Sequence, residues 1–119
     1  MGSNLRGVAS RNIDLQGVDL SRQDLQFIDL SNSNLSNSDL SHANLTGATL
    51  RGINLTGADL SQANLSGADL TGANLTNANI AGVNFSEANL DQVTFEGIEA
   101  GNANFCGAIM PDGLQRLCD

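Results

Sequence analysis

Large apolar side chains recur at every fifth residue of the chain from Leu15 to Phe95. The seventeen positions hold Leu except at Ile80, Phe85 and Phe95. A smaller apolar residue usually stands two positions earlier, Ala through the middle of the chain and Val or Ile toward both ends. Asp or Asn usually comes directly before the large residue, and Ser or Thr directly after it. The repeating unit is therefore A-(D/N)-L-(S/T)-(G/N).

A period of five fits neither regular secondary structure. In an α-helix, five steps of about 100° would place successive Leu residues about 140° apart, so no apolar stripe forms. In a continuous strand the odd period would send successive Leu side chains to opposite faces. The chain must therefore bend once per unit, so that each Leu points inward again.

The last position of the unit supplies the corner. Gly and Asn predominate there, and both tolerate the positive φ that a type II turn requires at its third position. Gly stands at positions 7, 17, 47, 52, 57, 67, 72, 82, 97 and 107, and Asn at 12, 32, 37, 77 and 102. The pattern predicts a solenoid of stacked corners.

From about Leu5 to Met110 the tandem units resemble the pentapeptide-repeat family. The resemblance implies an all-β fold: a right-handed quadrilateral parallel β-helix with four units per coil and a short C-terminal cap. Residues twenty apart would then stack about 4.8 Å from each other, giving a rod about 26 Å long. We expect one domain over residues 1–119, with repeats at about 5–110 and the cap at about 106–119.

The central ladder of large side chains is expected to form the core. Representative members are Leu40, Leu45, Leu60, Leu65, Phe85, Phe95 and Phe105. Phe85 and Phe105 are twenty apart and should stack at the C-terminal end, and outward Asn residues fall in columns that can form amide ladders between coils. Gln23 takes an inward position, as Ser33 and Ser38 do. Because a buried side-chain amide without a hydrogen-bond partner is costly, Gln23 should either form a hydrogen bond inside the solenoid or mark a local bulge in the coil.

The C-terminal segment contains a turn and two cysteines. The turn at 110–113 precedes Leu114 and Leu117, which we expect to lay one helical face over the last coil. Cys106 and Cys118 bracket this cap. Two interpretations stay open: a disulfide, which implies an oxidising compartment such as a periplasm or a thylakoid lumen, or two free thiols, which suit the cytoplasm.

Composition narrows the function classes. The 119 residues carry a formal net charge of −8, no Lys, and only 3% aromatic residues. There is no basic patch for direct nucleic-acid binding, and no apolar run near the roughly 20 residues of a membrane span. The N-terminus lacks the apolar region of a signal peptide. We therefore expect neither direct nucleic-acid contact nor membrane insertion.

The sequence contains no recognisable arrangement of catalytic residues. His42 is the single imidazole and is expected at an outward corner, about three coils from Cys106, too far for a Cys–His dyad. No spacing suits a metal or cofactor site. We expect no enzyme activity, no catalytic residues, no cofactor and no metal.

Acidic residues gather in one column if the coil holds twenty residues. Asp19, Asp39, Asp59 and Glu99 share it, with Asn79 between them. Two interpretations stay open: a surface for a basic partner, which would relieve the mutual repulsion, or exchange of Asp and Asn without functional meaning.

Two functions follow from these observations and from the resemblance. The first is a non-catalytic structural or protein-interaction scaffold for an unidentified protein partner, either a monomer or an end-to-end dimer. The alternative is a DNA mimic that binds DNA gyrase, as the resemblance to some family members implies. Eight net negative charges over about 26 Å approach the charge spacing of one DNA strand.

Overall fold

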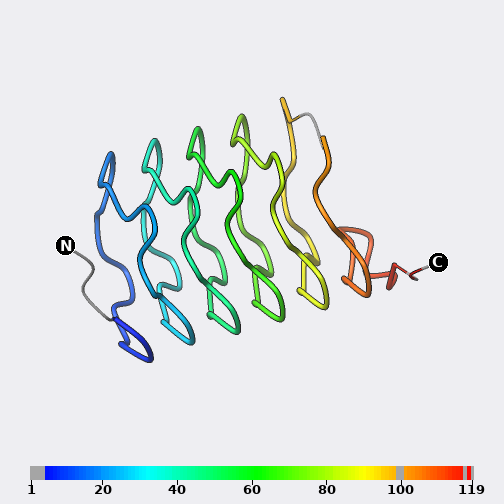
Figure 1. Cartoon of the computed structure of the whole chain (residues 1–119), viewed down its shortest axis with the longest axis horizontal. Helices are drawn as coiled ribbons and strands as arrows, with labels where there is room; N and C mark the ends of the chain where they lie inside the picture. Colours follow the sequence, from blue (N-terminus) through cyan, green and yellow to red (C-terminus); the bar gives the residue numbers. More distant parts are fainter. Residues whose placement is uncertain (1–4, 99–100, 117, 119) are drawn as a thin grey trace.

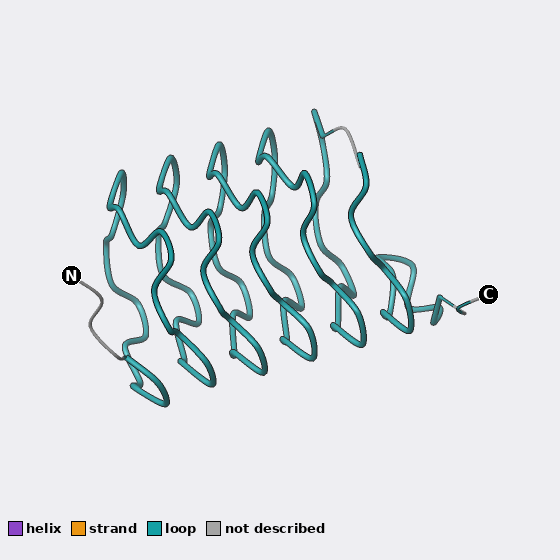
Figure 2. Cartoon of the chain, in the orientation of Figure 1, coloured by secondary structure: helices purple, strands orange, loops and turns teal. Residues whose placement is uncertain are grey.

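The computed structural model describes residues 5–98, 101–116 and 118. The chain winds as a right-handed β-helix with four sides (Figure 1). Its longest dimension is 38 Å and its cross-section is 24 × 23 Å. Across the described residues there is no helix, and the strands are reduced to isolated bridges joined by turns (Figure 2). The predicted all-β solenoid is confirmed.

Residues twenty apart pair in parallel throughout the rod. Asp39 bridges Asp59, and Asn44 bridges Asn64. The Leu40 amide donates to the Asp59 carbonyl at 2.8 Å, and the Asp59 amide donates back to the Ser38 carbonyl at 2.9 Å. Backbone bonds thus run in both directions between adjacent coils. This register confirms four units per coil.

The corners are type II turns. The Ala43 amide donates to the Leu40 carbonyl at 3.1 Å, and His42 between them has a φ of 60°. Positive φ also occurs at bulky residues that the sequence pattern did not single out: Arg22, Phe27, Gln62, Glu87 and Gln92. The left-handed conformation costs a non-glycine residue roughly 1–2 kcal/mol, which the ladder bonds of both neighbouring coils offset.

One predicted corner is displaced. Asn102 was expected to take the positive φ, but Gly101 takes it instead, at 53°. The Asn102 side chain is thereby turned toward the preceding coil, where its Oδ1 accepts the Gly82 amide at 2.7 Å. Elsewhere in this column a backbone carbonyl accepts that bond, as the Ser61 carbonyl does from the His42 amide at 2.9 Å. A side chain therefore replaces a backbone group at this corner.

Several corner glycines leave room for a larger corner side chain of the coil before. A Cβ built at Gly47 would lie 2.6 Å from the Phe27 ring, whereas one built at Gly67 would meet nothing within 4 Å. The same close approach recurs between Asn32 and Gly52, Asn37 and Gly57, Gln62 and Gly82, Asn77 and Gly97, and Glu87 and Gly107. At these corners Gly thus adopts the positive φ of the turn and also leaves room for the corner side chain of the preceding coil.

The core is the ladder of inward side chains. Leu40, Leu45, Leu60, Leu65 and Phe85 are buried. Phe95 and Phe105 are only partly buried and pack against the core at its C-terminal end. The expected stack of Phe85 on Phe105 is present, with ring centroids 5.2 Å apart, and Phe95 meets both rings edge-on.

The C-terminal cap is not helical. After the turn at 110–113 the chain returns antiparallel to the last coil, where Gln115 bridges Ile109. The Arg116 amide donates to the Ala108 carbonyl at 2.7 Å. Leu114 is 69% exposed and does not cover the coil, and Leu117 lies outside the described residues. Pairing with the free edge of the last coil satisfies backbone groups that a helix would leave open.

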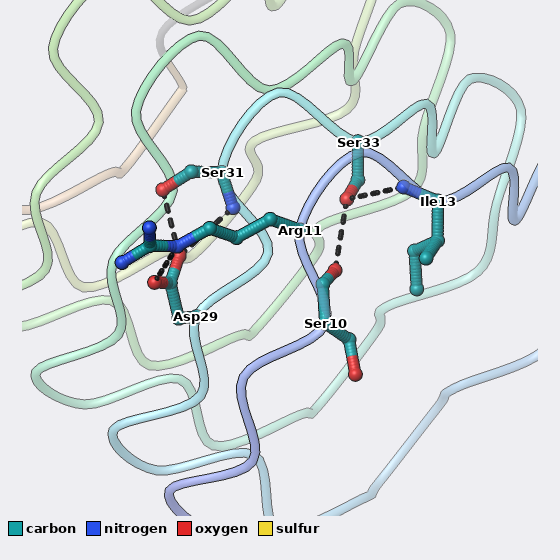
Figure 3. Close-up of polar contacts among 6 residues, drawn as sticks. All are labelled: Ser10, Arg11, Ile13, Asp29, Ser31 and Ser33. Atoms are coloured by element: carbon teal, nitrogen blue, oxygen red, sulfur yellow. Dashed lines mark hydrogen bonds and ion pairs between the residues drawn. The ribbon is translucent and has the colours of Figure 1, made fainter.

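Polar residues at inward positions behave differently from one another. Gln23 keeps the regular backbone bonds, so it marks no bulge, yet its buried Oε1 has no hydrogen-bond partner. Ser38 donates its hydroxyl to the Leu35 carbonyl at 2.7 Å. Ser33 reaches into the first coil instead, between Ser10 and Ile13 (Figure 3).

Candidate interaction surface

The Asp and Asn residues before each central side chain bind their own turn. Asn44 Oδ1 accepts the Thr46 amide at 3.1 Å and the Thr46 hydroxyl at 2.6 Å. Such a bond caps the turn locally. This explains why Ser or Thr so often follows the central residue. Among the described residues no hydrogen bond joins Asn side chains of neighbouring coils, so the expected amide ladders do not form.

One column carries three successive carboxylates. Asp19 bridges Asp39, Asp39 bridges Asp59, and Asp59 bridges Asn79. We call Asp19, Asp39 and Asp59 the acidic stripe. Glu99, also predicted in this column, lies outside the described residues. In the structure the column continues with neutral Asn79.

Each stripe carboxylate is held by the serine two residues later. Ser21, Ser41 and Ser61 each donate an amide at 2.9 Å and a hydroxyl at 2.6 Å to the same Oδ1. The Ser21 hydroxyl, followed by its amide, holds the pKa of Asp19 below its ordinary value. The carboxylates are thus oriented by their turns, and no ion pair reaches them from the described arginines.

Arginine pairs with acidic residues of two other columns. Arg11 Nε lies 2.5 Å from Asp29 Oδ2 (Figure 3), and Arg51 Nη1 lies 3.2 Å from Asp69 Oδ2. Arg6 approaches Asp24 at 3.8 Å. The Ser31 hydroxyl and then Arg11 lower the pKa of Asp29. The three carboxylates of the acidic stripe therefore lack the arginine partners that Asp24, Asp29 and Asp69 have.

The pairing of arginine and aspartate has a sequence signal that the five-residue pattern does not contain. In each pair Asp follows Arg by eighteen residues, from the position after a central residue to the position before one in the next coil. In a coil of twenty residues this spacing makes the two side chains neighbours.

His42, the single imidazole, lies at an exposed corner. In the described part of the chain no group of three or more His, Cys, Asp or Glu suits a metal ion. No helix in the described ranges has the length and apolarity to cross a membrane. The side faces offer small polar side chains, whereas the cavities of 210 and 240 Å³ lie at the two ends.

The two cysteines meet at the C-terminal end. Cys106 and Cys118 are paired as a disulfide, with their Cα atoms 5.0 Å apart. Cα separations of about 4.4–6.8 Å are usual for disulfides. Arg116, which lies between them in the sequence, places its guanidinium 5.6 Å from the centre of the Phe105 ring. The disulfide thus attaches the return segment to the last coil.

The pentapeptide-repeat profile matches residues 13–52 and 53–92, with eight copies. The chain belongs to the pentapeptide-repeat family. Among curated proteins, none matches it.

Solved pentapeptide-repeat structures share its fold. Rfr23 from the cyanobacterium Cyanothece 51142 has 32% identity and a TM-score of 0.85, over 87% of this chain and 84% of that one. A protein of the Arabidopsis thaliana thylakoid lumen has 36% identity and a TM-score of 0.68, over 88% and 70% of the two chains. QnrB1, a plasmid-mediated fluoroquinolone resistance protein, has 23% identity, a TM-score of 0.51 and coverage of 88% and 61%, a likeness of fold alone.

Proposed function

We propose that this pentapeptide-repeat protein is a non-catalytic scaffold whose acidic stripe binds a basic segment of a partner protein. The observation that carries the proposal is the register of Asp19, Asp39 and Asp59, three oriented carboxylates in successive coils with no arginine between them. Adjacent coils are about 4.8 Å apart, so like charges repel along the stripe, and a cationic segment would relieve this repulsion. The small Ser side chains beside the stripe leave it open to a partner.

The test removes the negative charges of the acidic stripe but keeps the shape of its side chains. Asn already occupies the equivalent position in other units, such as Asn34 and Asn54, where it caps its turn in the same way. A triple variant with Asp19→Asn, Asp39→Asn and Asp59→Asn should therefore fold normally. Its formal net charge becomes −5 instead of −8. Quantitative affinity capture from cells of the native source would compare proteins retained by the wild type and by this variant.

A charge-matched control separates the stripe from net charge. The control carries Asp14→Asn, Asp91→Asn and Asp112→Asn, which also give −5 but leave the stripe intact. The partner should be retained by the wild type and the control, lost by the stripe variant, and released as salt rises, because exposed charges are screened. Equal capture by all three proteins would contradict the proposal.

Mimicry of DNA is the second candidate, favoured by the net charge of −8 on a narrow rod. Against it, the acidic stripe spans only three coils, and Arg11 and Arg51 pair with Asp29 and Asp69 in another column. A gyrase supercoiling assay, titrated with salt, distinguishes the two functions. Absence of inhibition at micromolar protein would eliminate mimicry.

The cap supports a proposal for the compartment. A disulfide between Cys106 and Cys118 persists where thiols are oxidised, so we place the protein in an oxidising compartment. The likeness to a thylakoid-lumen protein agrees with this assignment.

A further inference from the structure

The first coil has backbone groups that find no partner among the described residues. In each inner coil, the amide before the central side chain donates to the coil below, as Asp29 does to Val8 at 2.8 Å and Asn34 to Ile13 at 2.9 Å. The equivalent amides of Ala9, Asp14 and Asp19 have no acceptor within the described residues. Their carbonyls likewise accept no bond from that part of the chain. Within the described residues the first coil therefore ends in an open β edge, and such edges readily pair with another chain.

Apolar side chains surround this edge. Val8 is 40% exposed, and Leu15 and Leu20 are only partly buried, whereas Leu25 in the next coil is fully buried. Ser10 takes a central position where a large apolar side chain is expected. A cavity of 210 Å³ opens there, lined almost entirely by Leu, Ile and Val side chains. The apolar cavity at this end of the rod is thus surrounded by backbone amide and carbonyl groups that are unpaired within the described residues.

The opposite end is closed by the chain itself. The return segment pairs Gln115 with Ile109, and the Gly107 amide donates to the Arg116 carbonyl at 2.9 Å. The disulfide holds this segment in place. Since the described part of the N-terminal end has no comparable cover, the two ends are not equivalent.

Charge also distinguishes the N-terminal end from the rest of the rod. Residues 5–24 contain three Arg and three Asp, so the first coil is formally neutral although the whole chain carries −8. Arg22 makes no ion pair with a described acidic residue. Two copies that met at this end would bring no excess of like charge together, whereas contact along the sides would oppose the acidic columns.

We propose that two copies of this chain join through their N-terminal ends, related by a two-fold axis perpendicular to the rod. The two-fold axis reverses chain direction, so the open edge of one copy would meet the open edge of the other antiparallel, which joins donors to acceptors. The cross-section of 24 × 23 Å offers about 550 Å² per copy, so about 1,100 Å² would be buried in total, just above the lower limit of specific interfaces. Val8 would become buried in this contact.

Three exposed apolar residues mark the three surfaces through which the protein could associate: Val8 at the N-terminal end, Phe27 on the side, and Leu114 at the C-terminal end. Single substitutions Val8→Glu, Phe27→Glu and Leu114→Glu therefore form a matched set. Sedimentation equilibrium would measure the mass of each protein over a range of concentrations. The wild type should reach twice 12.3 kDa at tens of micromolar, and Val8→Glu should weaken dimerisation about tenfold or more, because it buries a charge.

Amide hydrogen exchange supplies an independent readout. The amides of Ala9, Asp14 and Asp19 should exchange slowly in the dimer and fast on dilution, while the Leu60 amide stays protected at every concentration. Circular dichroism verifies that all three variants fold.

The proposal is overturned if the wild type stays monomeric at 100 µM, or if Leu114→Glu or Phe27→Glu dissociates the dimer and Val8→Glu does not. Protection of the three amides that is independent of concentration would also overturn it, because the chain itself would then cover the edge. These outcomes are independent of the acidic stripe, so this proposal and the scaffold function can fail separately.

Discussion

The hydroxyl of Ser33 lies 3.2 Å from the amide nitrogen of Ile13, twenty residues earlier in the chain. The same hydroxyl donates to the Ser10 carbonyl, also at 3.2 Å. In a neighbouring corner the inward amide bonds directly to the carbonyl three residues before it, as Val18 does to Leu15. One buried side chain of the second coil therefore completes a turn of the first.

This bridge predicts that Ser33→Ala is more destabilising than an ordinary loss of a hydroxyl. The substitution leaves a part-buried amide and a carbonyl without the atom between them, which costs about 1–3 kcal/mol. Ser38→Ala is the matched control, because Ser38 is equally buried and its hydroxyl bonds only to a carbonyl of its own turn. Urea unfolding would measure both variants. Equal losses would mean that the turn closes directly when Ser33 is absent.

The corner columns predict coupling between residues in successive coils. Gly47→Ala should cost more than Gly67→Ala, because both glycines have positive φ but only Gly47 lies against the Phe27 ring. Thermal unfolding of the single variants and of their combinations with Phe27→Ala forms a double-mutant cycle. Phe27→Ala should recover part of the loss in Gly47→Ala and none in Gly67→Ala. Additive effects in both pairs would contradict the steric account.

The turn serines predict a specific dependence of stability on acid. Hydrogen bonds from Ser21 and Ser31 lower the pKa of Asp19 and of Asp29, respectively, and Arg11 contributes to the second. A lowered folded-state pKa adds stability that is present above the unfolded value of about 3.9 and disappears as pH falls through the folded value. The double variant Ser21→Ala and Ser31→Ala should therefore lose less stability than the wild type between about pH 4 and pH 2.

A control for this acid dependence is available in another turn. The Thr46 hydroxyl bonds to Asn44 Oδ1 at 2.6 Å, and the Asn44 side chain does not titrate. Thr46→Ala should shift the urea midpoint equally at pH 7 and pH 3. If the serine double variant behaved in the same way, the acid sensitivity would come from other carboxylates.

Periodic features of this fold were predictable from sequence, and features of its ends were not. The inward placement of Leu40 and Leu60 follows from a spacing that every unit repeats, so one misplaced unit would disturb all its neighbours. Ser33, Asn102 and Leu114 occupy positions where the repeat is interrupted or stops. There the outcome depends on which nearby side chain satisfies a local backbone group, and a periodic pattern contains no such information.

The candidate site also combines features that follow from the repeat with features that do not. The alignment of Asp19, Asp39 and Asp59 follows from the twenty-residue coil. The arginine partners of Asp29 and Asp69 depend on long side chains whose reach is not part of the repeat. The acidic stripe is thus distinguished from the arginine-paired Asp29 and Asp69 only when these ion pairs are known.

The disulfide predicts a local effect on the C-terminal end. Cys106 and Cys118 close a loop with a sequence separation of 12, and cross-linking so short a loop adds at most about 3 kcal/mol of stability in the chain-entropy account. The amides of Gly107, Met110 and Arg116 bond within this cap, so reduction by a dithiol should increase their hydrogen exchange. The Leu60 amide, bonded between inner coils, should keep its protection.

Thiol titration decides whether this bond forms in the protein as isolated from its native compartment. We expect no reactive thiol in the unreduced protein, even after denaturation, and two after reduction. A double variant with Cys106→Ser and Cys118→Ser should reproduce the exchange pattern of the reduced wild type, because neither protein retains the cross-link. If two thiols titrated in the native, unreduced protein, both the cross-link and the argument for an oxidising compartment would be wrong. The structure of the coils would be unaffected, because their stability rests on buried Leu side chains and on the backbone hydrogen bonds between coils.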